Sequence, residues 1–202
     1  MPRDKTESHV RILAAAREEF LEQGFEKASM RRIGERCGMT AAGIYRHCQS
    51  KEELFGQLVE PAVKRLYGWL DGHVGRYMEA VEGDGAVLWK DTEIDLMREV
   101  VYPDMADYRL LLTCAQGTRY ADFLHELAVY NQSEMEKYLP MLRARGFRVR
   151  EIGSGELHLL LSAYTAALFE PVAHGYSQEE ALRYLDTVEA FFLPGWKTLL
   201  GF

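Results

Sequence analysis

Four side chains that can donate hydrogen bonds lie close together near the start of the chain: Tyr45, Arg46, His47 and Lys51. Two cations, a phenol and an imidazole in so short a stretch suit contact with phosphate oxygens. They follow the small residues 41–43, whose backbone could approach another molecule closely. This arrangement indicates binding to a phosphate backbone, provided that the surrounding elements hold the donors on one surface.

A second group of residues could hold a metal ion. Asp122 and His125 are one helical turn apart, as in half of a metal site. A di-iron helical bundle needs two Glu-x-x-His pairs and two further carboxylates, and the sequence has no second pair. The cysteines Cys37, Cys48 and Cys114 form no C-x-x-C pair, which argues against a disulfide framework and a zinc site. Hydrolase, metalloprotease and phosphate-loop motifs are also missing. We therefore expect no enzyme, no metal and no cofactor.

The donors lie within a segment whose pattern predicts short helices separated by a tight turn. An apolar stripe predicts a first helix over residues 9–23, and Gly24 is placed to end it. Ser29 is a plausible N-cap for a second helix, which Gly38 follows. Thr40 can cap a third helix over residues 41–48. Two short helices joined by a turn that contains glycine are typical of a helix-turn-helix.

The rest of the chain is also predicted to be helical, with about nine helices in all. Ser50 begins a fourth helix, with Glu53 completing a capping box, and Pro61 could kink it. Residues 83–85 read as a loop. Further helices are predicted over residues 87–102, 104–115, 118–138, 154–174 and 177–199. The sequence therefore predicts an all-α fold.

Charge divides the 202-residue chain into two parts. The net charge is −7, yet residues 1–51 carry ten Lys/Arg against seven Asp/Glu, and the remainder carries fourteen against twenty-four. An acidic body would be repelled by DNA phosphates, so only the first part could dock on them. We expect a DNA-binding domain over residues 1–52 and a second helical domain over residues 53–202. No run is apolar enough for a membrane span or an export signal, so a cytoplasmic location is expected.

The segment from Ser29 to Leu54 resembles the DNA-binding domain of the tetracycline-repressor (TetR) family of bacterial regulators. The matching features are Gly-Phe at residues 24–25, Cys-Gly-Met-Thr at 37–40, Gly-Ile-Tyr-Arg-His at 43–47 and Ser-Lys-Glu-Glu-Leu at 50–54. One departure is Gly34, which stands where alanine is common in the family. The resemblance covers about fifty residues, and the remaining 150 share with the family only their helical character and length.

The resemblance implies a role for each matching position. Tyr45 and Lys51 lie where the family contacts phosphates, and Arg31 where some members reach a base edge. An arginine there suits a bidentate contact to guanine. The DNA-binding residues that we predict are Ser29, Met30, Arg31, Thr40, Ala41, Ala42, Gly43, Tyr45, Arg46, His47 and Lys51.

The resemblance also implies that the second domain forms a dimer and encloses a small-molecule effector. For the homodimer interface we predict Leu157, Leu161, Tyr164, Leu168, Val188, Phe191, Phe192 and Trp196. For an apolar or aromatic small-molecule effector we predict a pocket of Trp89, Met97, Met105, Tyr108, Tyr120, Phe123, His125, Tyr138 and His158. A plain intrachain core is the alternative for both sets.

These observations favour a ligand-released transcriptional repressor that binds a palindromic operator as a homodimer. A dimer that covers a promoter blocks polymerase without further surfaces, which favours repression over activation. One alternative is a helical-bundle enzyme, and another is a helical interaction protein whose helix-turn-helix no longer binds DNA. Salt dependence separates the DNA-binding repressor from the interaction protein, because phosphate-neutralising contacts weaken as salt rises.

Overall fold

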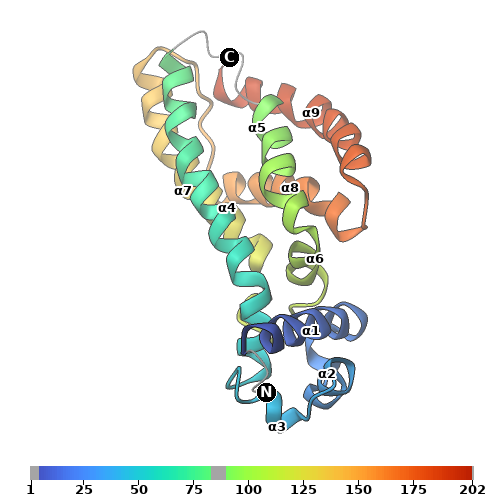
Figure 1. Cartoon of the computed structure of the whole chain (residues 1–202). Helices are drawn as coiled ribbons and strands as arrows, with labels where there is room; N and C mark the ends of the chain where they lie inside the picture. Colours follow the sequence, from blue (N-terminus) through green and yellow to red (C-terminus); the bar gives the residue numbers. More distant parts are fainter. Residues whose placement is uncertain (1–4, 83–89, 202) are drawn as a thin grey trace. The chain divides into compact units, whose positions relative to one another are not determined.

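The computed structural model describes residues 5–82 and 90–201, and all regular structure in those ranges is helical (Figure 1). The helices are α1 (Lys5–Lys27), α2 (Met30–Cys37), α3 (Ala41–Ile44), α4 (Lys51–Glu82), α5 (Lys90–Asp95), α6 (Met105–Thr113), α7 (Phe123–Ala144), α8 (Ser154–Ala173) and α9 (Gln178–Leu200). A π-helical turn (Leu96–Val101) and a 3₁₀ turn (Tyr102–Asp104) connect α5 to α6. The predicted all-α fold is confirmed.

The chain forms two compact units, and each is made from two separate stretches. Unit 1 comprises residues 1–65 and 104–121, and unit 2 comprises residues 66–103 and 122–202. The boundary between residues 65 and 66 therefore falls inside α4 rather than in a loop. Unit 1 contains the predicted helix-turn-helix together with α6 and the segment that follows it.

Aromatic rings form the centre of unit 1. Phe20 and Phe55 are fully buried, and their ring centroids lie 5.2 Å apart in an edge-to-face arrangement. Gly24 has φ +73°, a conformation that side chains with a Cβ resist, and it breaks the helical path of α1 as predicted. The chain then turns so that the Phe25 N–H donates to the Cys114 carbonyl (2.9 Å). This bond ties the end of α1 to the segment after α6.

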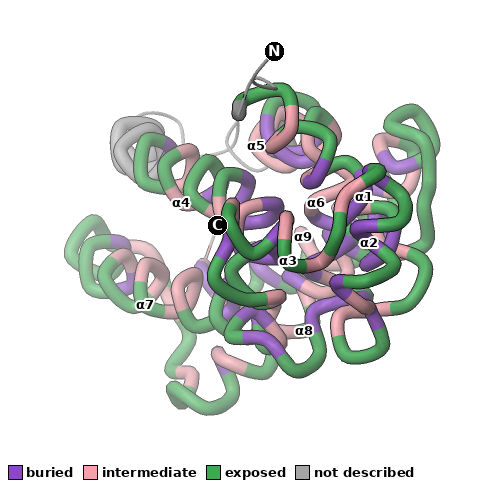
Figure 2. The backbone as a smooth tube through the Cα atoms, turned by 60° about the horizontal axis from the view of Figure 1, so that its bottom comes forward, coloured by how far each residue is buried: buried purple, intermediate pink, exposed green. Residues whose placement is uncertain are grey.

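Unit 2 is held together by α7, α8 and α9, whose inner faces form a continuous core. Its fully packed members are Leu139, Leu142, Leu157, Leu161, Trp196 and Leu200. Buried and exposed stretches alternate along these helices, which is the pattern of amphipathic helices around one core (Figure 2). No helix among the described residues is long and apolar enough to cross a membrane.

The predicted helices differ from the observed ones at a few boundaries. The third helix is shorter than predicted, because α3 ends at Ile44 and three turn residues follow it. Residues 96–101 are helical as predicted but adopt the wider π geometry. The predicted loop at residues 83–85 lies outside the described residues.

Candidate nucleic-acid interface

A buried carboxylate fixes α2 against α1. Glu19 is fully buried, and its Oε1 accepts hydrogen bonds from the Ser29 N–H (3.1 Å) and from Arg32 Nε (2.6 Å). The Arg36 guanidinium lies 3.4 Å from Glu19 Oε2 and also pairs with Glu22. A charge removed from water needs such partners, and removal of the Glu19 carboxylate would leave Arg32 and Arg36 without their buried partner. The network therefore sets the position of α2.

The turn between α2 and α3 depends on two glycines. Gly38 adopts the left-handed conformation (φ +68°), and its N–H is directed at the last carbonyls of α2. The Met39 N–H donates to the Gly34 carbonyl (2.8 Å), which brings the turn against α2. A Cβ on Gly34 would lie 2.5 Å from the Met39 carbonyl oxygen, so only glycine fits this approach. The predicted caps are also present, since Thr40 Oγ1 accepts from the Gly43 N–H (3.1 Å).

The turn presents α3 with one buried anchor and an open face. Ile44 is fully buried and anchors α3 in the bundle of α1, α2 and α3, which we call the head. Ala42 is exposed, and Ala41 and Gly43 are half-buried. The turn residues that follow also face outward, with half of the Tyr45 surface exposed and Arg46 exposed. The backbone of α3 can therefore approach a partner without obstruction by long side chains.

Two further donors belong to the same head. Arg31 on α2 is exposed, and its Nε donates to Glu35 (3.1 Å) one turn later. His47 is half-buried, and its ring stacks on the ring of His9 with centroids 6.1 Å apart. Exposed i, i+4 ion pairs contribute only about 0.3–0.5 kcal/mol, so Arg31 can exchange Glu35 for another partner at low cost.

The structure places two of the predicted residues in supporting positions. Met30 is buried, so its side chain packs in the core of the head instead of facing a partner. Ser29 is the N-cap of α2, with its N–H donated to Glu19. Their side chains thus position α2, and direct contact with DNA by the Met30 side chain does not fit its burial.

Lys51 has the least expected environment. Its ammonium lies over the Phe25 ring and donates to the carbonyls of Phe25 (2.6 Å), Glu26 (3.1 Å) and Ala28 (3.1 Å). Burial lowers the pKa of this ammonium, and the charge of Glu26 acts in the opposite direction. All three N–H donors are therefore directed at the carbonyls that end α1. A phosphate contact by Lys51 stays a prediction, and it would have to be made in exchange for these bonds.

The residues predicted for an effector pocket are divided between the two units. Met105, Tyr108 and Tyr120 belong to unit 1, and the others that are described belong to unit 2. Tyr108 is fully buried and donates its hydroxyl to the Ala62 carbonyl (3.0 Å), which is a role in the core. The His125 ring is exposed and packs edge-on against the half-buried His158 at 5.2 Å. Trp89 lies outside the described residues.

The predicted dimer residues mostly face inward. Five of the eight are buried in the chain's own core: Leu157, Leu161, Leu168, Val188 and Trp196. Phe191, which was also predicted, is 77% exposed, and Leu159 and Leu160 are exposed apolar residues of α8. The stripes selected from the sequence therefore face mostly the chain's own core, with exposed apolar side chains beside the buried ones.

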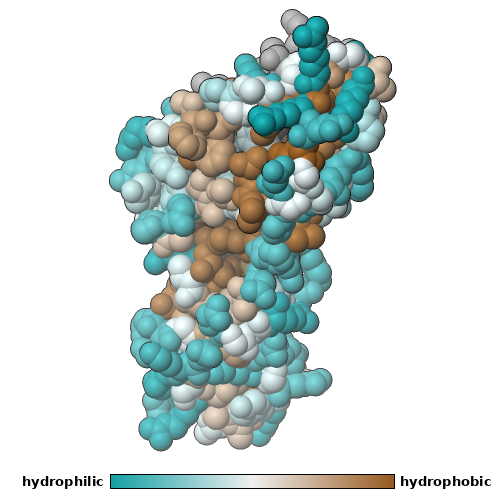
Figure 3. All heavy atoms as spheres, turned by 180° about the vertical axis from the view of Figure 1, so that it is seen from behind, coloured by the Kyte–Doolittle hydropathy of each residue, from teal (hydrophilic) through white to brown (hydrophobic). Residues whose placement is uncertain are grey.

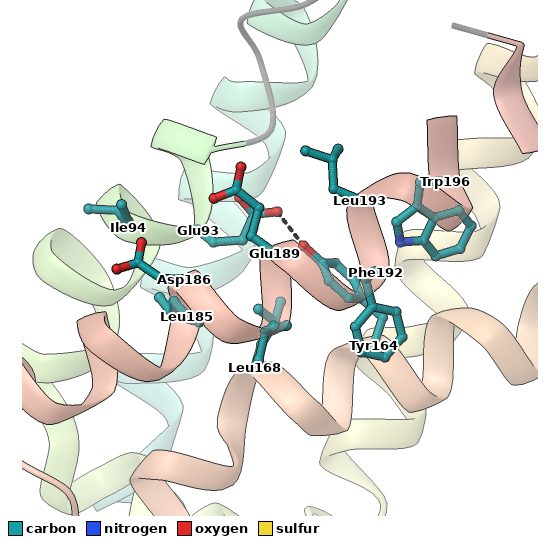
Figure 4. Close-up of a pocket in the computed structure, with 11 residues that line it drawn as sticks. Glu93, Ile94, Tyr164, Leu168, Leu185, Asp186, Glu189, Phe192, Leu193 and Trp196 are labelled. Carbon is teal, nitrogen blue, oxygen red and sulfur yellow. Dashed lines mark hydrogen bonds between the residues drawn. The ribbon is translucent and has the colours of Figure 1, made fainter. Parts of the chain in front are cut away.

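Unit 2 also contains a small recess that the sequence did not reveal. It has a volume of about 20 Å³ and lies between α5, α8 and α9 (Figure 4). Its lining residues are Glu93, Ile94, Tyr164, Leu168, Leu185, Asp186, Val188, Glu189, Phe192, Leu193 and Trp196. The sequence spacing could have indicated this recess, because Asp186 and Glu189 lie one turn apart on the same side of α9 as Phe192. No group of three side chains placed to hold a metal ion is found among the residues that the structure describes.

Comparison with known proteins gives the class of the molecule. The model of the family described as "Bacterial regulatory proteins, tetR family" matches residues 12–58, which span the helix-turn-helix. The chain is 24% identical over 181 residues to the HTH-type transcriptional repressor Rv1474c of Mycobacterium tuberculosis, covering 88% of this chain and 89% of that protein. It is 36% identical over 76 residues to the HTH-type transcriptional regulator UidR of Escherichia coli, which is 38% of this chain and 35% of the relative.

A solved structure supports the fold along most of the chain. The TetR family transcriptional regulator PfmR of Thermus thermophilus superimposes with a TM-score of 0.53 at 21% identity, over 88% of this chain and 96% of that one. The fold, the helix-turn-helix and these relatives define a DNA-binding transcriptional regulator. Residues 12–58, which include the helix-turn-helix, match the tetR family of bacterial regulatory proteins, and this match confirms the resemblance found in the sequence.

Proposed function

We propose that this regulator is a ligand-released repressor that acts in the cytoplasm as a homodimer on a palindromic operator. The observation that carries the proposal is the open face of the head, where the exposed Arg31, Ala42, Tyr45 and Arg46 surround a helix anchored by Ile44. A relative of nearly the same length is named a transcriptional repressor, which favours repression.

The proposed contacts divide into two classes. Residues 41–43 would lie against base edges through methyl groups and backbone, and Arg31 would read a guanine. Thr40, Tyr45, Arg46 and His47 would contact phosphates, which position the head without reading sequence. With few base contacts from α3, a large share of the affinity would come from phosphates.

A homodimer would use the apolar surface that the chain itself leaves uncovered. Leu159 on α8 and Phe191 on α9 are 70% and 77% exposed, and Leu160 adds to them. Apolar side chains gather on the face of unit 2 that Figure 3 shows. Two heads on one duplex would enter successive major grooves, about 34–36 Å apart. An effector that prefers the DNA-free state would release the dimer, and DNA would weaken effector binding by the same factor.

The proposal is tested by selecting bound sequences from a random duplex pool with the full-length protein at low and at moderate salt. We expect a palindrome, with an affinity that falls steeply as salt rises. Failure to enrich any sequence, together with salt-independent binding, would contradict the proposal and favour an interaction protein without DNA function.

Variants then assign the contacts on the selected operator. Arg46→Ala should weaken binding to all sequences and make the slope of log K against log salt shallower by about 0.9, the value for one lost phosphate contact on B-DNA.

Arg31→Ala should change the preferred sequence, because a bidentate base contact supplies about 1–3 kcal/mol of discrimination. Arg183→Ala is the control, since Arg183 is an exposed cation on α9 that pairs with Glu179 one helical turn away. An unchanged sequence preference would remove Arg31 from the readout.

A further inference from the structure

Two histidines from different helices meet where α7 packs against α8. His125 lies on α7 and His158 on α8, and their ring centroids are 5.2 Å apart with the ring planes at 77°. The sequence predicted no metal site, because Asp122 and His125 have no second ligand pair beside them in the chain. The fold brings a second imidazole to His125 from a distant part of the chain. Imidazole nitrogen is a ligand of Zn²⁺, Cu²⁺ and Ni²⁺.

Hydrogen bonds hold the His158 ring in the orientation of a metal ligand. The Gln132 amide nitrogen donates to Ser154 Oγ (2.7 Å) and to Glu136 Oε1 (2.8 Å), which leaves the amide oxygen as an acceptor. That oxygen lies 3.0 Å from His158 Nδ1, so Nδ1 carries the hydrogen and Nε2 carries the lone pair. A histidine that binds a metal almost always donates its other ring N–H to such an oxygen. His158 is therefore oriented as a metal ligand, with Nε2 as the binding atom.

The ring nitrogens that remain for an ion are weakly engaged or open. His158 Nε2 lies 3.4 Å from Ser162 Oγ, which is longer than a usual hydrogen bond. The His125 ring is exposed and makes no hydrogen bond in the part of the chain that the structure describes. A metal ion would therefore displace one weak hydrogen bond and could reach the pair from outside.

The separation of the two rings matches that of two ligands on one ion. Two imidazoles on a tetrahedral Zn²⁺, with Zn–N distances of about 2.0–2.1 Å, have ring centroids roughly 5 Å apart. The rings of His9 and His47 lie 6.1 Å apart and are inclined by only 25°, which fits such a geometry less well. No third side chain joins the α7–α8 pair among the described residues, so water would complete the coordination.

We propose that His125 and His158 bind a divalent late first-row transition-metal ion, with Gln132 as the positioning residue. The ion would join α7 to α8, so it should stabilise the folded chain as any ligand does that binds only the native state. Imidazole ligands favour Cu²⁺ and Zn²⁺ over the hard cation Mg²⁺, and Cu²⁺ binds such ligands more tightly than Zn²⁺. The site is independent of the proposed repressor function.

The first test is calorimetric titration of the full-length protein, without DNA and without a polyhistidine tag, with ZnCl₂, CuCl₂ and MgCl₂. We expect one Zn²⁺ per chain, tighter binding of Cu²⁺ and no binding of Mg²⁺. The melting temperature should rise with the concentration of Zn²⁺ and stay constant with Mg²⁺. No binding of Zn²⁺ at millimolar concentration, or equal binding of Zn²⁺ and Mg²⁺, would overturn the proposal.

Variants then test the role of each residue. His125→Ala and His158→Ala should each lower the affinity for Zn²⁺ by more than tenfold, since loss of a partner outside the ligand set already costs about 10–100-fold. His125 is exposed, so its variant should fold and keeps the test valid even if His158→Ala does not. Gln132→Leu should lower the affinity about tenfold, and Gln132→Glu should restore it because a carboxylate also accepts from His158 Nδ1. Unchanged affinity in His125→Ala would overturn the proposal.

Two other histidines provide matched controls. His174→Ala removes an exposed histidine that pairs with Glu170, and His9→Ala removes one member of the other histidine pair. Both variants should bind Zn²⁺ as the unmodified protein does. Loss of binding in His9→Ala but not in His125→Ala would place the ion in the head and overturn the proposal. A stoichiometry of one Zn²⁺ per two chains would also overturn it, because the ion would then join two copies instead of two helices of one chain.

Discussion

Individual side chains of the head have roles that range from fully structural to fully exposed. Ile44 and Met30 are buried and hold the head together, whereas Tyr45 and Arg46 face outward. The residue types alone were enough to predict that Ile44 is buried and that Arg46 is exposed. For Met30 the spacing to Ile33 and Cys37 indicated the apolar side of the second helix, and the structure confirms its burial, whereas its place in the DNA-binding set came from the family resemblance.

Lys51 shows a contact that local sequence cannot reveal. Its three carbonyl partners lie 23 to 26 residues earlier in the chain. Only the folded arrangement of α1 and α4 brings them to the ammonium, so no spacing rule could have predicted them. The match to the family located the residue, and the structure shows what it contacts.

We expect Lys51→Ala to destabilise the protein. Hydrogen bonds to a charged group contribute about 1.5–3 kcal/mol, so the free energy of unfolding should fall by about that amount. Urea denaturation followed by circular dichroism measures the change. Lys64→Ala is the matched control, because Lys64 is an exposed lysine on the same helix that pairs with Glu60. Unchanged stability together with weaker DNA binding would instead assign Lys51 to the phosphate backbone.

At the scale of elements, the caps were the most predictable features. Ser29, Gly38 and Thr40 each act within four residues of the helix end that they cap, so the signal is local in the sequence. The end of α3 at Ile44 was not predicted, because no glycine or proline stops the helix there. Tertiary packing of the buried Ile44 and Cys48 sets the turn instead.

The helices of this chain should tolerate a Cβ at some glycines and not at others. Gly34→Ala places a Cβ 2.5 Å from the Met39 carbonyl oxygen, whereas a Cβ at Gly68 on α4 meets nothing within 4 Å. Gly68→Ala should therefore stabilise the protein by about 0.5–1 kcal/mol, the usual gain in a helix. Gly34→Ala should lower the melting temperature and weaken DNA binding, because the turn must open. A melting temperature for Gly34→Ala at or above that of the unmodified protein would mean that the turn is not held as tightly as its geometry indicates.

At the scale of the whole molecule, the sequence predicted which faces of α8 and α9 are apolar but not what covers them. Leu157 and Leu161 belong to the longest apolar stripe of α8, and that stripe packs within the chain. Leu159 and Leu160 lie between these positions and remain exposed. Periodicity identifies an apolar stripe, but it cannot distinguish an internal partner from a second copy.

The exposed apolar side chains should hold the dimer that we propose. The double variant Leu159→Glu with Phe191→Glu would place charges in an interface that excludes water, so the protein should sediment as a monomer. Sedimentation velocity measures this, and circular dichroism should show unchanged helix content because neither side chain is part of the core. Val129→Glu serves as the control on α7, since Val129 is also exposed. A double variant that remains dimeric would place the interface elsewhere.

The discontinuous construction of unit 1 limits how this regulator can be recombined with others. A chimaera that exchanges only residues 1–52 would separate the Phe25 N–H from the Cys114 carbonyl, and the Glu52 carboxylate from the Arg119 N–H that it accepts. It would also replace Glu26, whose side chain lies close to Gly117. A transplanted head would therefore need residues 104–121 as well, because these residues form one compact unit with the helix-turn-helix although they lie more than fifty residues further along the chain.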